Sequence, residues 1–66
     1  MNAKQIRQDA ISATRGQLRH CGYDPKTVSS FEIEAALNEV RPQFANQASD
    51  NQFDQFMREF RKWQKQ

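Results

Sequence analysis

The sequence predicts an all-α protein, a compact three-helix bundle with helices at about residues 3–21, 30–41 and 50–64. Apolar residues recur at steps of three and four in three separate segments, which is the spacing of one face of an α-helix. Shorter polar connections, one containing Pro25 and one following Pro42, separate these segments. No stretch alternates apolar and polar residues over four or more positions, so no strand is expected.

The length of the chain limits how it can be organised. With 66 residues we expect a single small helical domain over residues 1–66. A chain of this size buries only about 60% of the surface that its unfolded form exposes. Five Phe, one Trp and one Tyr offset the low apolar fraction of 36%, because aromatic side chains bury large areas. The core should therefore be small and aromatic.

The first helix, residues 3–21, has a light apolar face in which small residues predominate. Its members are Ala3, Ile6, Ala10, Ala13, Leu18 and Cys21. Gly16 lies in mid-helix at a cost of about 1 kcal/mol relative to Ala, and indicates either close packing or a weak point. Gly22 suits the left-handed residue that ends a helix. We expect His20 on the surface and Cys21 as a small core residue.

The second helix, residues 30–41, has a strong start signal. Ser29 and Glu32 match a capping box, S-x-x-E, and Val28 and Ile33 match a hydrophobic staple. The apolar arc that follows consists of Ile33, Ala36, Leu37, Val40 and Phe44.

Two residues of this second segment lie outside its regular pattern. Pro42 cannot donate a helical hydrogen bond, so the helix should end or kink near Arg41. Phe31 points away from the apolar arc, so it either folds back over the preceding loop or is exposed for binding.

The third helix, residues 50–64, is the most amphipathic. Ser49 and Gln52 form a second capping-box pattern before it. Its apolar face comprises Phe53, Phe56, Met57, Phe60 and Trp63, and its opposite face carries Arg58, Arg61, Lys62 and Lys65. Together the three helices predict a buried set of Ile6, Ala10, Leu18, Ile33, Leu37, Val40, Phe53, Phe56, Phe60 and Met57.

Catalytic and metal-binding patterns are missing from the sequence. Cys21 is the single cysteine, which excludes an internal disulfide, and a zinc site needs more Cys and His ligands than Cys21 and His20 supply. The two are adjacent, so on a helix they diverge and do not make a catalytic pair. We therefore predict no enzymatic activity, no cofactor and no metal. No apolar run is long enough for a membrane span, and a cytoplasmic location is expected.

Charge is divided unevenly along the chain. Residues 1–22 carry four basic residues against Asp9, a net +3, and residues 51–66 carry a net +2. Residues 23–50 between them carry two basic and five acidic residues, a net −3. One interpretation is attraction between neighbouring helices of opposite sign. The other is a basic surface made by the first and third helices, suited to a phosphate backbone or an acidic protein.

These patterns favour a small protein that acts by binding. The first hypothesis is a protein-interaction module: an accessory subunit, an inhibitor or a regulator. The alternative is a small basic nucleic-acid-binding protein that uses the first and third helices. The aromatic arc of the third helix exceeds what one Ala-rich helix covers, so a homodimer or a partner-bound state is expected. The candidate contact residues are Arg15, Arg19, Arg58, Arg61, Lys62, Lys65, Phe56 and Trp63.

A few short patches resemble a known family. Asp24-Pro25-Lys26-Thr27-Val28, Gln47-Ala48-Ser49 and Trp63 are similar to patches of the IscX family of small iron–sulfur-assembly accessory proteins. That family is strongly acidic where this chain is basic, so the resemblance assigns no functional residue.

Overall fold

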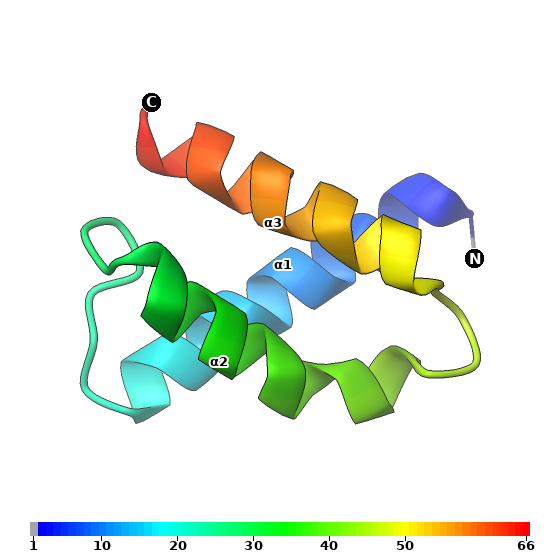
Figure 1. Cartoon of the computed structure of the whole chain (residues 1–66), viewed down its shortest axis with the longest axis horizontal. Helices are drawn as coiled ribbons and strands as arrows, with labels where there is room; N and C mark the ends of the chain where they lie inside the picture. The colour runs from blue at the N-terminus through cyan, green and yellow to red at the C-terminus, as the bar shows by residue number, and fades with distance from the viewer. Residues whose placement is uncertain (1) are drawn as a thin grey trace.

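Three α-helices and one short 3₁₀ helix make up residues 2–66, the part of the chain that this computed structural model describes (Figure 1). They are α1 (Ala3–His20), α2 (Ser30–Val40), η1 (Arg41–Phe44) and α3 (Asp50–Gln64). Within the described residues there is no β-strand. The all-α three-helix class and the three predicted helices are thereby confirmed.

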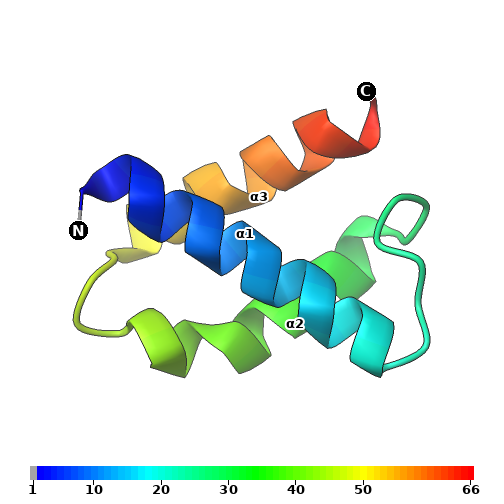
Figure 2. The same cartoon turned by 180° about the vertical axis from the view of Figure 1, so that it is seen from behind.

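Helix α1 packs across the other two helices. It lies behind α2 and α3 in Figure 1 and in front of them in Figure 2, where the three can be followed from the opposite side. The C-terminal ends of α1 and α3 lie apart from one another. The connection between α1 and α2 is at the same side of the molecule as these two helix ends. The core is enclosed between α1 and the pair formed by α2 and α3.

Both ends of α1 are stabilised locally. The Asn2 side chain accepts a hydrogen bond from the amide of Gln5 at 2.8 Å, which caps the first turn. At the other end Gly22 has a φ of 88°, and its amide donates to the carbonyl of Arg19 at 3.0 Å. The Tyr23 amide donates to the carbonyl of Leu18 at 2.9 Å. These two bonds form a Schellman motif, which is why the helix ends where Gly22 predicted.

The two predicted capping boxes have different outcomes. At α3 the box forms, because the Gln52 amide donates to Ser49 Oγ at 3.4 Å and the Ser49 amide donates to Gln52 Oε1 at 2.7 Å. At α2 the predicted box is wrong. Ser29 makes no side-chain bond to the helix amides, because its hydroxyl donates to the Glu32 carboxylate instead. The hydroxyl and the carboxylate bond to one another rather than to the backbone.

Pro42 lies in a short 3₁₀ helix that follows α2 directly. Helix α2 stops at Val40, and η1 continues with Pro42 among its first residues. A 3₁₀ turn tolerates Pro42 there because the first amides of a helix have no intrahelical partner. Phe44 at its end is half-buried and packs against the core, as expected.

The buried side chains form two neighbouring clusters. One contains Ile6, Ala10, Leu37, Phe53 and Phe56, and the other contains Leu18, Ile33, Ala36 and Phe60. Edge-to-face aromatic pairs order them: the ring centroids of Phe53 and Phe56 are 5.2 Å apart, and those of Phe60 and Trp63 are 5.4 Å apart. Of the ten residues predicted as the buried set, all are buried except Met57, which is half-buried.

One core prediction needs correction, one buried residue was not predicted, and one predicted residue has a side chain outside the described part of the chain. Cys21 is exposed, because Leu18 is the last α1 residue that faces the core and the chain turns at Gly22 before Cys21 is covered. Thr14 is buried although no pattern marked it, and its hydroxyl donates to the carbonyl of Ala10 at 2.8 Å. The side chain of Ala3 lies outside the described residues. Gly16 is exposed and is not a close-packing site.

Candidate functional site

An apolar groove lies between the end of α1 and the outer face of α2. Its volume is about 290 Å³. We call it the Phe31 groove; it is lined by Gln17, Leu18, Cys21, Tyr23, Phe31, Glu32, Ala35, Ala36 and Glu39. Leu18, Ala35 and Ala36 supply apolar surface, and Tyr23 and Phe31 supply aromatic rings.

Phe31 is the most exposed large apolar side chain of the described residues. It is 79% exposed, and Tyr23 is 47% exposed. The expectation that Phe31 folds back over the preceding loop is therefore wrong, and the exposed alternative holds. Ile33, Leu37 and their neighbours occupy the inner face of α2, so the helical period places Phe31 on the outside. The preceding loop lies elsewhere, because Pro25, Lys26 and Val28 form hydrogen bonds with the end of α3.

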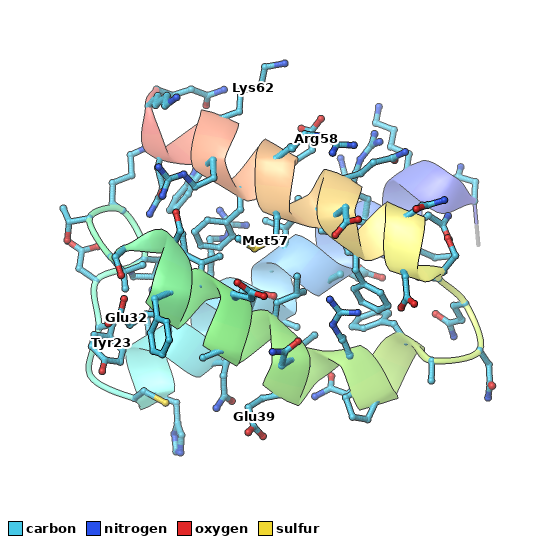
Figure 3. The ribbon with its side chains drawn as sticks, viewed as in Figure 1. Tyr23, Glu32, Glu39, Met57, Arg58 and Lys62 are labelled. Atoms are coloured by element: carbon cyan, nitrogen blue, oxygen red, sulfur yellow. The ribbon has the colours of Figure 1, made fainter. Side chains whose placement is uncertain are left out.

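Carboxylates flank the aromatic surface of this groove. Glu32 and Glu39 are among its lining residues, which include no Lys or Arg. Glu34 is exposed on the other flank of Phe31 along α2. Figure 3 shows Tyr23 and Glu32 close together at the left side of the molecule, and Glu39 on its lower edge. The groove therefore combines exposed aromatic rings with negative charge.

A second, basic groove lies on α3. It has a volume of about 510 Å³, and we call it the Met57 groove; it is lined by Met57, Arg58, Glu59, Arg61, Lys62 and Lys65. Its charged residues are exposed and Met57 is half-buried. The guanidinium of Arg61 donates to the hydroxyl of Ser30. Figure 3 shows Arg58 and Lys62 on the upper edge, with Met57 between α3 and α2.

Trp63 is held by side chains from two other segments. The Arg15 guanidinium lies 4.9 Å and the Lys26 ammonium 4.3 Å from its ring centroid. Both are cation–π contacts, and the ring also packs on Phe60. Trp63 is half-buried.

The loop before α2 is fastened to the end of α3 through polar contacts, which we call the clasp. Lys26 Nζ donates to the Trp63 carbonyl at 2.6 Å. Gln64 Nε2 donates to the carbonyls of Pro25 and Val28 at 2.9 and 3.0 Å. A cation at the C-terminal end of a helix is favourably placed relative to the helix dipole.

The structure brings only part of the predicted contact set together. Arg58, Arg61, Lys62 and Lys65 share the Met57 groove. Arg15 joins Lys62 and Trp63 in a cleft of about 530 Å³ between α1 and α3, whose lining also carries Asp9 and Glu59. Arg19 is exposed in the last turn of α1, which ends away from the end of α3 (Figures 1 and 2).

Phe56 must be removed from the surface set. It is only 3% exposed, packed edge to face against Phe53 in the core cluster. Helix α1 covers this part of the aromatic arc of α3, so a partner cannot reach Phe56 without opening the core. The expectation that Phe56 contacts a partner is corrected accordingly.

Direct ion pairing between the helices is sparse. In the described part of the chain there is one ion pair, Arg41 to Asp50, at 3.3 Å. The Arg41 guanidinium also lies 4.8 Å from the centroid of Phe53, so it joins η1 to the start of α3. The opposite charges of α1 and α2 thus form no close ion pair among residues 2–66, and most charged side chains remain exposed to solvent.

The described residues provide neither a metal centre nor a membrane-spanning helix. No three His, Cys, Asp or Glu side chains gather there in a way that could hold a metal ion. None of the described helices combines the length and apolar character that crossing a membrane requires.

Comparison with protein-family models, with curated proteins and with solved structures found no match to this chain. The case for a function therefore rests on the two grooves and the chemistry of the side chains that line them.

The sequence pointed to Phe31, whose exposure for binding was one of two alternatives, but not to the other residues of the Phe31 groove. Tyr23, Phe31, Glu32 and Glu39 come from a loop and from the outer face of α2. One signal was available, since Phe31 lies off the apolar arc of its helix. The contribution of Leu18 and Cys21 had no sequence signal, because it depends on how α1 crosses α2.

Proposed function

We propose that this protein is a non-catalytic protein-interaction module, an accessory subunit, inhibitor or regulator, that binds a partner protein through the Phe31 groove. The observation that carries the proposal is the 79% exposure of Phe31 beside an apolar groove of about 290 Å³. Exposed aromatic rings at concave apolar surfaces are typical anchors of protein interfaces. We place the activity in the cytoplasm, where the exposed thiol of Cys21 stays reduced.

The carboxylates of the groove define the chemistry of the partner. Glu32 and Glu39 favour a segment that carries Lys or Arg next to its apolar side chains, and disfavour an acidic one. An amphipathic helix with apolar anchors and basic flanks fits this description, because its apolar stripe can lie along a groove between two helices.

The test is an NMR titration with two model peptides of the same length, one built from Leu and Lys and the other from Leu and Glu. We expect the Leu–Lys peptide to shift the amide signals of Tyr23, Phe31 and Ala35, and the Leu–Glu peptide to leave them unchanged. Phe31→Ser should abolish the shifts. A matched control, Gln55→Ser, changes an exposed position on α3 outside both grooves and should bind as the parent does.

Two results would count against the proposal. One is equal binding of the Leu–Lys and Leu–Glu peptides, which would remove the role of Glu32 and Glu39. The other is a set of shifted amides confined to α3, which would place the contact on the basic face instead.

A second candidate function, nucleic-acid binding, is favoured by the Met57 groove. Arg58, Lys62 and Lys65 are exposed there and form no ion pair within the described residues. Such a row of cations suits a phosphate backbone. The measurement is the anisotropy of a labelled oligonucleotide across a salt series. Arg58→Gln with Lys62→Gln should reduce the slope of log K against log salt by about 0.7–0.9 for each phosphate that is no longer neutralised. An unchanged slope would exclude this surface.

A further inference from the structure

We propose that the Phe31 groove of one copy of this protein binds the Met57 groove of a second copy, so that copies associate head to tail. The inference rests on the proposed function, because it assigns an occupant to the same groove. The partner proposed above has apolar side chains next to Lys or Arg. Helix α3 of this chain has the same features, because its Met57 is flanked by Lys and Arg.

The two grooves are opposite in charge. Glu32 and Glu39 line the Phe31 groove, with Glu34 beside it, and no basic side chain lines it. The Met57 groove is lined by four basic residues and a single carboxylate, Glu59. A contact between two copies of the Phe31 groove would bring like charges together, and so would a contact between two copies of the Met57 groove. Pairing one with the other therefore is the arrangement that electrostatics favours.

The apolar parts of the two grooves also match. Phe31 projects from α2 with most of its surface in solvent. Met57 is half-buried, and its thioether is a flexible group that packs well against aromatic rings. The methylene stems of Arg58, Arg61 and Lys62 extend this surface, and their cationic groups can lie over the face of the Phe31 ring. We place Phe31 of one copy against Met57 of the next.

The positions of the grooves determine the kind of assembly. Figure 3 shows Glu39 on the lower edge of the molecule and Glu32 at its left side, with Arg58 and Lys62 on the upper edge. A contact that joins two different surfaces is heterologous, and it leaves one free groove of each kind at the two ends. Because the two grooves lie on different edges of the molecule, association continues beyond a dimer, into an open chain or, where the rotation between copies closes, a ring. Because the contact pairs exposed charges, salt should weaken it.

The experiment uses two variants that each disable one groove. Phe31→Ser with Glu39→Gln, called the groove variant, disables the Phe31 groove and keeps the Met57 groove. Arg58→Glu with Lys62→Glu, called the surface variant, disables the Met57 groove and keeps the Phe31 groove. All four changes fall on exposed side chains, and helical content by circular dichroism verifies the fold. Sedimentation velocity is run from micromolar to millimolar concentration on protein freed of nucleic acid.

Complementation between the variants is the decisive measurement. We expect the average mass of the parent to rise continuously with concentration and to fall when salt is added. Each variant alone should stay monomeric. An equimolar mixture should form a one-to-one dimer that grows no further, because the only intact pair of grooves is then used once. Phe31→Ala and Lys62→Gln provide milder versions if either double variant unfolds.

Several outcomes would overturn the inference. They are a parent that remains monomeric at millimolar concentration, a parent whose mass stops at a dimer, a single variant that still associates, or a mixture that stays monomeric. The Leu–Lys peptide titration separates this failure from that of the proposed function. A monomeric parent that still binds the peptide through Tyr23, Phe31 and Ala35 would eliminate self-association and retain the protein-interaction role.

Discussion

At the residue scale, Gly16 and Gly22 provide a matched pair of substitutions with opposite expected effects. Gly22 has a φ of 88°, a conformation that costs Ala roughly 1 kcal/mol, so Gly22→Ala should lower the free energy of unfolding by about that amount. A methyl group added at Gly16 would meet nothing within 4 Å, so Gly16→Ala should raise it by roughly 0.5–1 kcal/mol. Urea unfolding measures both, and changes of equal sign would contradict this account.

Phe60 is the side chain whose loss the fold tolerates least. It is 1% exposed and lies in the centre of the second core cluster. Phe60→Ala should cost roughly 3–5 kcal/mol, against a total of about 3–10 kcal/mol for a chain of 66 residues. We expect a variant without a cooperative thermal transition. Phe31→Ala is the control and should change stability by less than about 0.5 kcal/mol, because Phe31 is mostly in solvent.

The burial of a residue was predictable from the sequence where it depends only on the face of its own helix. The helical period alone placed Ile6, Leu37 and Phe60 in the core. It failed at Cys21, whose burial depends on where the chain turns. It also failed at Thr14, which is buried although it is polar. Periodicity reports which face a residue occupies and not how far the neighbouring helix extends over it.

At the scale of the helix, the two N-terminal serines should respond differently to the same change. Ser49 accepts a hydrogen bond from the amide of Gln52, so Ser49→Ala should cost about 1 kcal/mol. Ser29 bonds to the carboxylate of Glu32 and caps no amide, so Ser29→Ala should cost less. Thermal unfolding of the two variants gives the comparison, in which 1 kcal/mol corresponds to about 4–8 °C. An equal or larger loss at Ser29 would show that it caps α2 after all.

The clasp gives a second prediction at this scale. Lys26→Met keeps the stem but removes the ammonium, which contacts both the carbonyl and the ring of Trp63. The loss should be about 1 kcal/mol, since the group is only partly buried and water screens the interaction. Lys65→Met is the matched control, at an exposed lysine of the same helix end. Equal stability of the two variants would mean that the clasp contributes nothing.

The sequence predicted where the helices begin and end more accurately than it predicted the hydrogen bonds that form these ends. Gly22 ended α1 as predicted, and Ser49 with Gln52 started α3 as predicted. The same S-x-x-E spacing at Ser29 admits two arrangements, because a serine hydroxyl can donate to Glu32 as well as accept from an amide. Pro42 likewise permitted an end or a kink, and α2 ends at Val40, next to the expected Arg41, with the 3₁₀ helix η1 directly after it.

At the scale of the whole molecule, salt should separate folding from association. The described residues contain one ion pair, Arg41 to Asp50, and Asp50 is almost fully in solvent. The fold therefore depends chiefly on apolar burial, and its melting temperature should change little as salt is added. Association through the Phe31 and Met57 grooves should weaken over the same range. Differential scanning calorimetry on the monomeric surface variant provides the measurement, and a melting temperature that falls steeply with salt would contradict it.

The candidate site was less predictable than the fold because it is assembled from distant segments. The basic row of α3 lies on one helix and was visible in the sequence as Arg58, Arg61, Lys62 and Lys65. The Phe31 groove needs Leu18 from α1 and Cys21 directly after it, as well as Ala35 and Glu39 from α2. Only the crossing of these two helices brings them together, and helical spacing carries no information about that crossing.

The clasp also has a consequence for the order in which parts of the molecule open. The last turn of a terminal helix usually exchanges its amide hydrogens almost freely, because opening it costs little. Here Lys26 holds the carbonyl of Trp63 across 37 positions of the chain, and Gln64 holds the carbonyls of Pro25 and Val28. The end of α3 can then open only when residues 24–28 release it, so the amides of both segments should exchange together as one cooperative unit. In Lys26→Met this coupling weakens, and the end of α3 should exchange ahead of the loop.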